Sequence, residues 1–338
     1  MGSLGRAYLA FWLATTLLAV EVVRPADAPT SRAGTPGPYL GFITVGTDGN
    51  LWFPERRAIG RMTLSGHVDR FPLEHEPNIL ITAGPSGSIW FVLPGELGAL
   101  APDGHLRTYP LPPDVGRVGG ITTGPDGNLW LTLDKAGSPG RIGRLSGAGE
   151  VVTYPVPAKY SALGGIVTGP DGNLWFTDGI PDAIGRVTPV GAITMYALPE
   201  GGNGYYPNDI VAGSDGALWF TGTGGIGRIT TSGQFSWHRV GPGLRWPWRI
   251  AAGSDGNLWA TEIYGDHVWR VTPAGKVRAF RVPTHNSGPW GIAAGPDGNL
   301  WVTATCANRL VRITPAGKMR EFPVSDVHWD GSYCIDPV

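Results

Sequence analysis

The sequence predicts an all-β fold, a seven-bladed β-propeller with four antiparallel strands in each blade. A phrase of the type Gly-Pro-Asp-Gly-Asn-Leu-Trp occurs seven times, and a second phrase of the type Ile-Gly-Arg-x-Thr-Pro-x-Gly follows each copy, abbreviated in the second unit. The leading glycines are 38, 40, 45, 44, 40 and 42 residues apart. A period near forty residues is the size of one four-stranded blade. The seven copies of the first phrase span residues 46–52, 84–90, 124–130, 169–175, 213–219, 253–259 and 295–301.

Composition agrees with this fold and argues against one class of partner. The chain has 53 glycines and 31 prolines but only 16% charged residues, which is typical of many short strands joined by tight turns. Its 26 basic and 27 acidic side chains leave a formal charge of −1, so no broad positive field is available for nucleic acid.

The strands of one unit can be read in order, with the seventh as the example. Residues 291–295 are small, as expected of the innermost strand near a crowded axis, and residues 296–299 form a tight turn. Residues 300–303 form the second strand, whose Trp301 is expected to fill the space between neighbouring blades. Residues 309–313 form the third strand. Residues 318–324 form the outer strand, where proline and charges protect an exposed edge.

The N-terminus reads as a targeting segment. Arg6 precedes an apolar run at residues 8–20, and Ala26-Asp27-Ala28 matches a cleavage site of small residues. We therefore expect a signal peptide at 1–28, cleaved after Ala28, and a secreted or periplasmic protein with no transmembrane segment after cleavage. An uncleaved anchor is the alternative, although a span needs about 20 apolar residues. The expected organisation continues with a disordered or extended segment at 29–38, the propeller at 39–324 and a tail at 325–338.

Closure of the ring is less obvious from the sequence. The first unit appears whole from residue 40 to residue 73, so closure is expected to depend on packing of the seventh unit against the first. Cys306 and Cys334 are the two cysteines of the chain. In an oxidising compartment a disulfide between them would fix the tail, with a loop-entropy contribution of roughly 3 to 4 kcal/mol. Two free thiols are the alternative.

At residues 169–189 the two phrases together resemble the streptogramin B lyases, also called virginiamycin B lyases. The resemblance extends over about residues 39–324. It implies a seven-bladed propeller, and it implies the family's reaction, a magnesium-dependent elimination that opens cyclic depsipeptide antibiotics. The repeat is specific for the fold and much less so for the reaction.

The resemblance also implies catalytic positions, and this chain departs from the family at each of them. A family histidine falls on Trp248, a metal-binding glutamate on Gly288, the general-base histidine on Trp290, and a last glutamate on Ala304 or Thr305. An indole cannot deprotonate a carbon acid, and magnesium prefers hard oxygen ligands. We therefore expect no streptogramin lyase activity from these positions.

Loops that lead into the inner strands of a propeller gather at one end of the channel, and here they carry aromatic residues. This pattern predicts binding of a small molecule, a glycan or a peptide at the channel mouth. The alternative is that the rings only fill the axis. The predicted ligand-binding residues are Tyr205, Tyr206, Asn208, Trp246, Trp248, Arg249 and Trp290.

A relocated enzyme site is the second functional alternative. Glu55, Asp178 and Glu262 each end a second strand, and Glu262 with His285 and Asp209 would form a shifted catalytic or metal site. Such an enzyme would be a carbon–oxygen lyase or a lactonase, and magnesium is expected only in that case. The structural interpretation is that these carboxylates bind turns or neighbouring blades.

Overall fold

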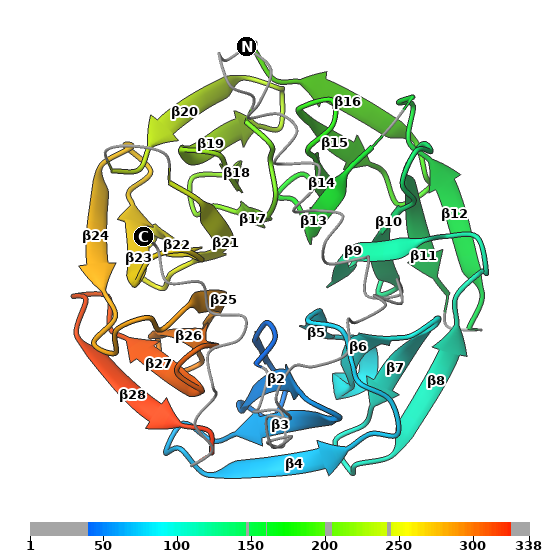
Figure 1. Ribbon diagram of the computed structural model, residues 1–338. Helices are drawn as coiled ribbons and strands as arrows, with labels where there is room; N and C mark the ends of the chain where they lie inside the picture. The colour runs from blue at the N-terminus through cyan, green and yellow to red at the C-terminus, as the bar shows by residue number, and fades with distance from the viewer. Residues whose placement is uncertain (1–39, 147–148, 160, 200–204, 242–244, 326–338) are drawn as a thin grey trace, which may run out of the picture. The chain divides into compact units, whose positions relative to one another are not determined.

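The computed structural model describes residues 40–146, 149–159, 161–199, 205–241 and 245–325. In these residues, seven four-stranded antiparallel sheets surround a central axis, and the strands of each sheet follow one another in chain order (Figure 1). The predicted fold class is therefore confirmed. The predicted signal peptide and the segment 29–38 lie outside the described residues, as does the tail from residue 326.

Each blade contributes one strand to each of four concentric layers, and a short 3₁₀ turn, η1 (Pro85–Gly87), lies in the second blade. The inner strands are β1 (Thr44–Val45), β5 (Ile81–Ala83), β9 (Arg117–Thr123), β13 (Leu163–Thr168), β17 (Ile210–Ala212), β21 (Pro247–Ala252) and β25 (Pro289–Ala294). The second strands are β2 (Leu51–Glu55), β6 (Ile89–Leu93), β10 (Leu129–Asp134), β14 (Leu174–Asp178), β18 (Ala217–Gly222), β22 (Leu258–Glu262) and β26 (Leu300–Ala304). The third strands are β3 (Ala58–Met62), β7 (Glu96–Leu100), β11 (Arg141–Leu145), β15 (Ala183–Val187), β19 (Gly225–Thr230), β23 (His267–Val271) and β27 (Arg309–Ile313). The outer strands are β4 (Val68–Pro72), β8 (Leu106–Pro110), β12 (Val151–Pro155), β16 (Ile193–Ala197), β20 (Phe235–Arg239), β24 (Val277–Arg281) and β28 (Met319–Pro323).

The seventh blade shows where the sequence prediction and the structure differ. Its inner strand begins at Pro289, two residues before the predicted start, because the register with β26 shifts between Pro289 and Ile292. Similar shifts interrupt the inner strands of the third, fourth and sixth blades. A bulge of this kind re-aims the side chains beside it and bends the strand.

The recurring tryptophan is buried and hydrogen-bonded to its own turn. In the fourth blade Trp175 has no exposed surface, and its Nε1 donates to Asp171 Oδ1 at 3.0 Å. The second blade has Ser86 in place of this aspartate, and the buried Nε1 of Trp90 finds no acceptor within the described part of the chain. The six blades with the bond contain the pairs Trp52–Asp48, Trp130–Asp126, Trp175–Asp171, Trp219–Asp215, Trp259–Asp255 and Trp301–Asp297.

The recurring arginine of the third strand also has a structural role. Arg270 lies over the ring of Trp259, 5.7 Å from its centroid, and its Nη1 donates to the carbonyl oxygen of Pro315 in the next blade at 3.0 Å. Arg144 makes the corresponding bond to Pro189 at 3.2 Å. These two arginines therefore link neighbouring blades.

Buried threonines of the second strands link successive blades near the axis. Thr177 Oγ1 donates to the carbonyl oxygen of Asn208 at 2.8 Å, and Thr132 Oγ1 donates to that of Gly164 at 2.7 Å. Thr221 and Thr261 donate in the same way to the carbonyl oxygens of residues 248 and 290. The second strands therefore determine where the backbone of the next inner strand lies.

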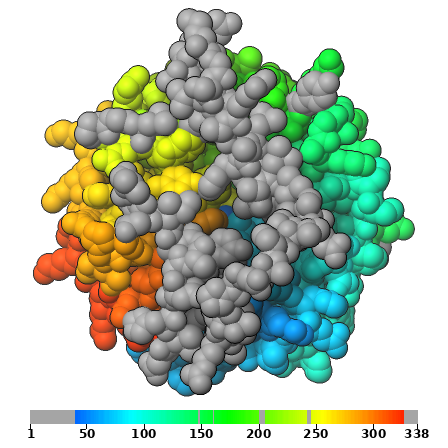
Figure 2. Space-filling view, in the orientation of Figure 1, coloured from blue at the N-terminus to red at the C-terminus, as the bar shows by residue number. Residues whose placement is uncertain are grey.

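The ring closes by packing of the seventh blade against the first, as expected. One hydrophobic cluster contains Leu40 and Phe53 of the first blade together with Trp301 and Phe322 of the seventh. Thr305 Oγ1 donates to the carbonyl oxygen of Leu40 at 2.9 Å. Figure 2 shows the blades following one another around the face in chain order.

Cys306 follows β26 and is disulfide-bonded. Its predicted partner, Cys334, lies outside the described residues, so the pairing of the two stays a prediction. In the described residues, no helix is long and apolar enough to cross a membrane.

Candidate ligand site at the channel mouth

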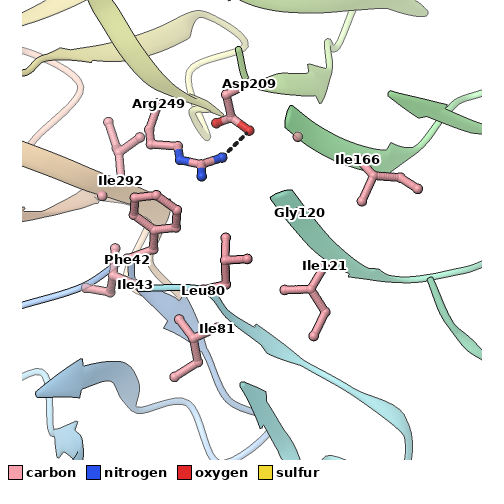
Figure 3. Close-up of a pocket in the computed structure, with 12 residues that line it drawn as sticks. Phe42, Ile43, Leu80, Ile81, Gly120, Ile121, Ile166, Asp209, Arg249 and Ile292 are labelled. Carbon is pink, nitrogen blue, oxygen red and sulfur yellow. Dashed lines mark hydrogen bonds and ion pairs between the residues drawn. The ribbon is translucent and has the colours of Figure 1, made fainter. Parts of the chain in front are cut away.

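The central channel contains a cavity of about 140 Å³ that all seven inner strands surround (Figure 3). Each blade places one residue directly before a recurring isoleucine at this level of the channel. Five isoleucines, Phe42 and Leu80 supply the apolar side chains of the lining, and Asp209 and Arg249 are its charged residues. The residues before the isoleucines are, in blade order, Phe42, Leu80, Gly120, Gly165, Asp209, Arg249 and Gly291.

Arg249 extends across the channel toward Asp209 (Figure 3). Its Nη1 donates to Asp209 Oδ1 at 2.8 Å, and its Cζ lies 3.6 Å from the centroid of the Phe42 ring. Burial lowers the pKa of the guanidinium, and the Asp209 carboxylate acts in the opposite direction. The cation is therefore held by a carboxylate at one side and an aromatic face at another.

Asp209 has a partner at each carboxylate oxygen. Oδ1 accepts from Arg249, and Oδ2 accepts from the backbone nitrogen of Ile250 at 3.0 Å. A Cβ atom on Gly165 would lie 2.5 Å from Asp209 Oδ1, so glycine is needed at that position. The carboxylate thus bridges the fifth and sixth blades beside the axis.

Trp248 and Trp290, the two tryptophans at positions where the family resemblance implies histidines, contact each other. The rings of Trp248 and Trp290 are T-shaped, with centroids 6.0 Å apart, and Trp290 also lies 6.5 Å from Phe42. Both side chains are half-buried and pack against the hydrophobic cluster that contains Phe42. The structure thus brings together Trp248, Arg249 and Trp290 of the predicted ligand-binding residues.

The other predicted ligand-binding aromatics lie in separate groups. Trp246 contacts Tyr264 edge to face, with centroids 6.4 Å apart. Tyr205 packs on Phe235 and Trp237, at 5.4 and 4.7 Å between centroids, so this side chain is part of the packing of the fifth blade.

The side chain of Asn208 is buried and binds the backbone of the next blade. It is buried, with 8% of its surface exposed, and its Nδ2 donates to the carbonyl oxygen of Trp248 at 2.8 Å. The carbonyl oxygen of Asn208 accepts from Thr177 Oγ1 and from the backbone nitrogen of Gly165. Asn208 therefore helps to fix the backbone on which Trp248 is carried.

Two aspartates that the sequence reasoning did not select hold the loops of the mouth. Asp182, between β14 and β15, accepts from the backbone nitrogens of Tyr205 and Tyr206 at 3.1 and 2.6 Å. Asp266, between β22 and β23, accepts from those of Asn286 and Ser287 at 3.1 and 2.7 Å.

Each of the two loops bound by Asp182 and Asp266 also contains a residue in a left-handed backbone conformation. Tyr206 has φ of 43° and Asn286 has φ of 52°. A positive φ costs free energy in a residue other than glycine, and it persists where the surrounding structure requires it. The sequence signal was the presence of an aspartate just before the third strand in both preceding blades.

The remaining positions that match the family's lyase residues contribute no acid, base or charged metal ligand. Gly288 has φ of 56°, and a Cβ atom there would lie 2.5 Å from Cys306 Sγ. Ala304 is fully buried, and the hydroxyl of Thr305 binds Leu40 in the ring closure. A glutamate at residue 288 would therefore be strained in this structure.

The candidates for a relocated enzyme site lie in different environments. Glu262 is 3% exposed, and its carboxylate accepts from Arg245 Nη1 at 3.1 Å and from Trp269 Nε1 at 3.2 Å. Asp209 is paired with Arg249, and His285 is exposed. In the described residues, no group of three or more His, Cys, Asp or Glu side chains is placed to hold a metal ion.

The other carboxylates that end second strands are also bound locally. Glu55 Oε2 accepts from Arg70 Nε at 2.8 Å, and Asp178 Oδ1 accepts from the backbone nitrogens of Ala162 and Ile180. Asp134, a further carboxylate of this kind, accepts from Arg117 Nη2 at 3.3 Å. Burial is the main cause that raises the pKa of Glu55, Asp134 and Asp178.

The sequence model of the Virginiamycin B lyase family matches residues 21–222 and 114–331. The chain belongs to this family. Among curated proteins, no relative matches it.

Solved structures of family members are similar over most of the propeller. A streptogramin B lyase structure is 32% identical, with a TM-score of 0.74 over 86% of this chain and 95% of that chain. Virginiamycin B lyase from Staphylococcus aureus is 36% identical, with a TM-score of 0.69 over 74% of this chain and 85% of that chain. A catalytically inactive variant of that enzyme, solved with quinupristin, is 35% identical, with the same TM-score and coverage.

Two positions that resemble family histidines are occupied by the Trp248 and Trp290 pair, and a position that resembles a family glutamate is occupied by Gly288. The family scaffold is retained.

Proposed function

We propose that this protein is an exported, non-catalytic member of the virginiamycin B lyase family that binds a small molecule, a glycan or a peptide at the channel mouth. The observation that carries the proposal is the T-shaped pair of Trp248 and Trp290, which stands where the family resemblance implies histidines. Indoles offer a large apolar surface and one N–H donor, which suits binding of a flat ring or a sugar face.

The chemistry of the matched positions supports binding rather than elimination. An indole has no basic nitrogen that could remove a proton from carbon, and Gly288 has no side chain to coordinate magnesium. The lyase or lactonase alternative has less support, because Glu262 is held by Arg245 and Trp269 whereas Asp209 is held by Arg249.

The loops that Asp182 and Asp266 bind support the proposal that the binding surface is formed before the ligand binds. Asp182 and Asp266 each accept two consecutive backbone N–H groups from a loop of the mouth. A binding surface fixed in advance loses less conformational entropy when the ligand binds.

Export is proposed from the N-terminal pattern of Arg6, the apolar run and the small residues before Pro29. Sequencing of the mature N-terminus tests it, with Pro29 as the expected first residue. An intact Met1 would contradict cleavage.

The binding proposal is tested by calorimetric titration with three probes: an oligosaccharide, an unstructured peptide and quinupristin. We expect at least one probe to bind, and Trp248→Ala combined with Trp290→Ala to reduce its affinity by roughly 100-fold or more, since each buried aromatic anchor contributes on the order of 2 kcal/mol. The double variant should keep the circular dichroism spectrum of the wild type.

Tyr109→Ala is the matched control. Tyr109 is on the outer strand β8, and its half-buried aromatic side chain lies against Trp90 of β6. The substitution should leave affinity unchanged. Unaltered affinity in the folded Trp248 and Trp290 double variant, or no binding of any probe, would refute the proposed site.

A further inference from the structure

Hydrogen-bond donors at the channel mouth lack acceptors. Arg249 Nε and Trp290 Nε1 are both buried, and neither has a hydrogen-bond partner in the described part of the chain. Both oxygens of Asp209, the acceptor nearest to Arg249, are already bonded. A buried donor without an acceptor costs free energy, so two of them in one region require an explanation.

The free donors of Arg249 lie along one edge of its guanidinium. Among the described residues, the side chain donates one hydrogen bond, from Nη1 to Asp209. The edge that carries Nε and Nη2 is left for another partner. Figure 3 shows the guanidinium reaching into the lumen, with the apolar side chains of Leu80, Ile121 and Ile166 around the space beside it.

The shape of that edge determines which chemical group can accept its hydrogen bonds. Two adjacent N–H groups in one plane match the two oxygens of a carboxylate, which can accept both bonds at once. The adjoining cavity of about 140 Å³ has the size of a single small ring, since engineered cavities near 150 Å³ hold benzene. The isoleucine side chains of its lining offer apolar contacts to such a ring.

A second arginine, Arg117, acts on the charge of Arg249. Burial is the main cause that lowers the pKa of Arg249, and repulsion from the Arg117 guanidinium adds to it. Arg117 begins β9, and its Nη2 donates to Asp134 Oδ2 and to the carbonyl oxygen of Leu163, both at 3.3 Å. A second cation therefore lies close enough to act on the first.

We propose that the ligand of the channel mouth carries a carboxylate, which binds the Nε and Nη2 edge of Arg249 while an apolar group beside it lies against the isoleucine side chains of the lining. This inference rests on the proposed function and adds the chemical class of the ligand. The Phe42 ring and Asp209 hold the guanidinium in place before the carboxylate arrives.

The test compares benzoate with benzyl alcohol on the full-length protein at pH 7, by NMR titration. The two probes share a ring that fits the cavity, and only benzoate has the carboxylate. We expect benzoate to bind at least ~10-fold more tightly, which is the effect of hydrogen bonds to a charged group. The ¹⁵N–¹H signal of Arg249 Nε should shift with benzoate and not with benzyl alcohol.

The matched variant combines Arg249→Gln with Asp209→Asn. Loss of Arg249 alone would leave the Asp209 carboxylate buried without its cation, whereas the double change replaces the ion pair by two amides. We expect the variant to lose the preference for benzoate and to bind both probes equally. If it does not fold, the Arg249 Nε signal of the wild type decides the question.

The outcomes separate this inference from the proposed function. Equal affinity for the two probes, or a benzoate affinity that the folded double variant retains, overturns the carboxylate site. If a glycan, peptide or quinupristin binds through Trp248 and Trp290 while benzoate does not bind, the carboxylate inference fails and the mouth site stands. If no probe binds in either experiment, both are overturned.

Discussion

Asp178 illustrates how a single buried carboxyl group behaves in this ring. It has no exposed surface, and one of its oxygens has no partner in the part of the chain that is described. Burial raises its pKa to about 6, and the negative charge of Asp134 adds to the effect, although backbone hydrogen bonds from Ala162 and Ile180 oppose it. A carboxyl group with a raised pKa inside a protein often indicates a functional site, but here it closes a turn of the fourth blade.

The raised pKa predicts a pH dependence of stability. Between pH 4 and pH 6 the unfolded chain releases the Asp178 proton while the folded chain retains it, so stability falls as pH rises through this window. Asp178→Asn removes this loss and should be more stable than the wild type at pH 7 by up to about 3 kcal/mol, with no gain below pH 4.

Urea unfolding of the wild type and of Asp178→Asn from pH 3.5 to pH 7.5 measures the difference between their free energies of unfolding. Because the two proteins differ only at residue 178, the pH dependence of this difference reports on Asp178 and not on the other carboxylates. A difference that stays constant from pH 4 to pH 6 would contradict the assignment.

Other single residues show what sequence reasoning can and cannot place. Arg249 and Asp209 both precede a recurring isoleucine in neighbouring blades, so alignment of the repeats puts them at one level of the channel. The sequence reasoning placed Asp209 in a shifted enzyme site and Arg249 in a ligand site, so their ion pair was not predicted. The contact of Arg249 with Phe42 was not predicted either, because it depends on how far each side chain reaches across the axis.

At the scale of the element, the turn between the first two strands of a blade is a repeated unit with one exception. In the fourth blade, Asp171 accepts from Trp175 Nε1 at 3.0 Å and from Asn173 Nδ2 at 2.9 Å. Burial alone would raise the pKa of Asp171, but the hydrogen bonds from Asn173 and Trp175 give a net lowering. The second blade carries Ser86 at this position, has positive φ there, and lacks the bond to Trp90.

This difference between blades predicts a difference between variants. Asp171→Ala should destabilise the protein by about 1 to 2 kcal/mol, because it leaves the N–H of Trp175 without an acceptor. Ser86→Ala, at the equivalent position of the second blade, should change stability by less than about 0.5 kcal/mol.

Urea unfolding at pH 7 compares the two variants with the wild type. Equal destabilisation by both would show that the bond from aspartate to tryptophan does not stabilise the blade.

The repeated phrases made most elements predictable, since the second, third and outer strands of the seventh blade begin and end within one residue of their predicted bounds. The inner strand was less predictable. Its bulge at Pro289 to Ile292 depends on the packing of the inner strands around the central axis, and that packing exists only in the closed ring. Asp182 and Asp266 were missed for a similar reason. Each binds a loop of the following blade, and an aspartate just before the third strand does not by itself indicate that contact.

At the scale of the whole molecule, the ring closes without a blade shared between the first and last of the described residues. Thr305 binds Leu40, and Arg70 Nη2 donates to the carbonyl oxygen of Val324 at 2.8 Å, so the seventh blade meets the first through side chains. The scaffold is that of the virginiamycin B lyase family, and function is decided by the few residues that the ring brings to its axis.

We propose that this propeller has kept the family scaffold and lost the family's reaction. The most direct measurement is chromatography of quinupristin incubated with the purified protein and magnesium, since quinupristin is the compound solved with the inactive Staphylococcus aureus relative. We predict that all of the quinupristin remains cyclic, whether or not it binds. Accumulation of ring-opened quinupristin, at a rate that rises with protein concentration, would contradict the claim.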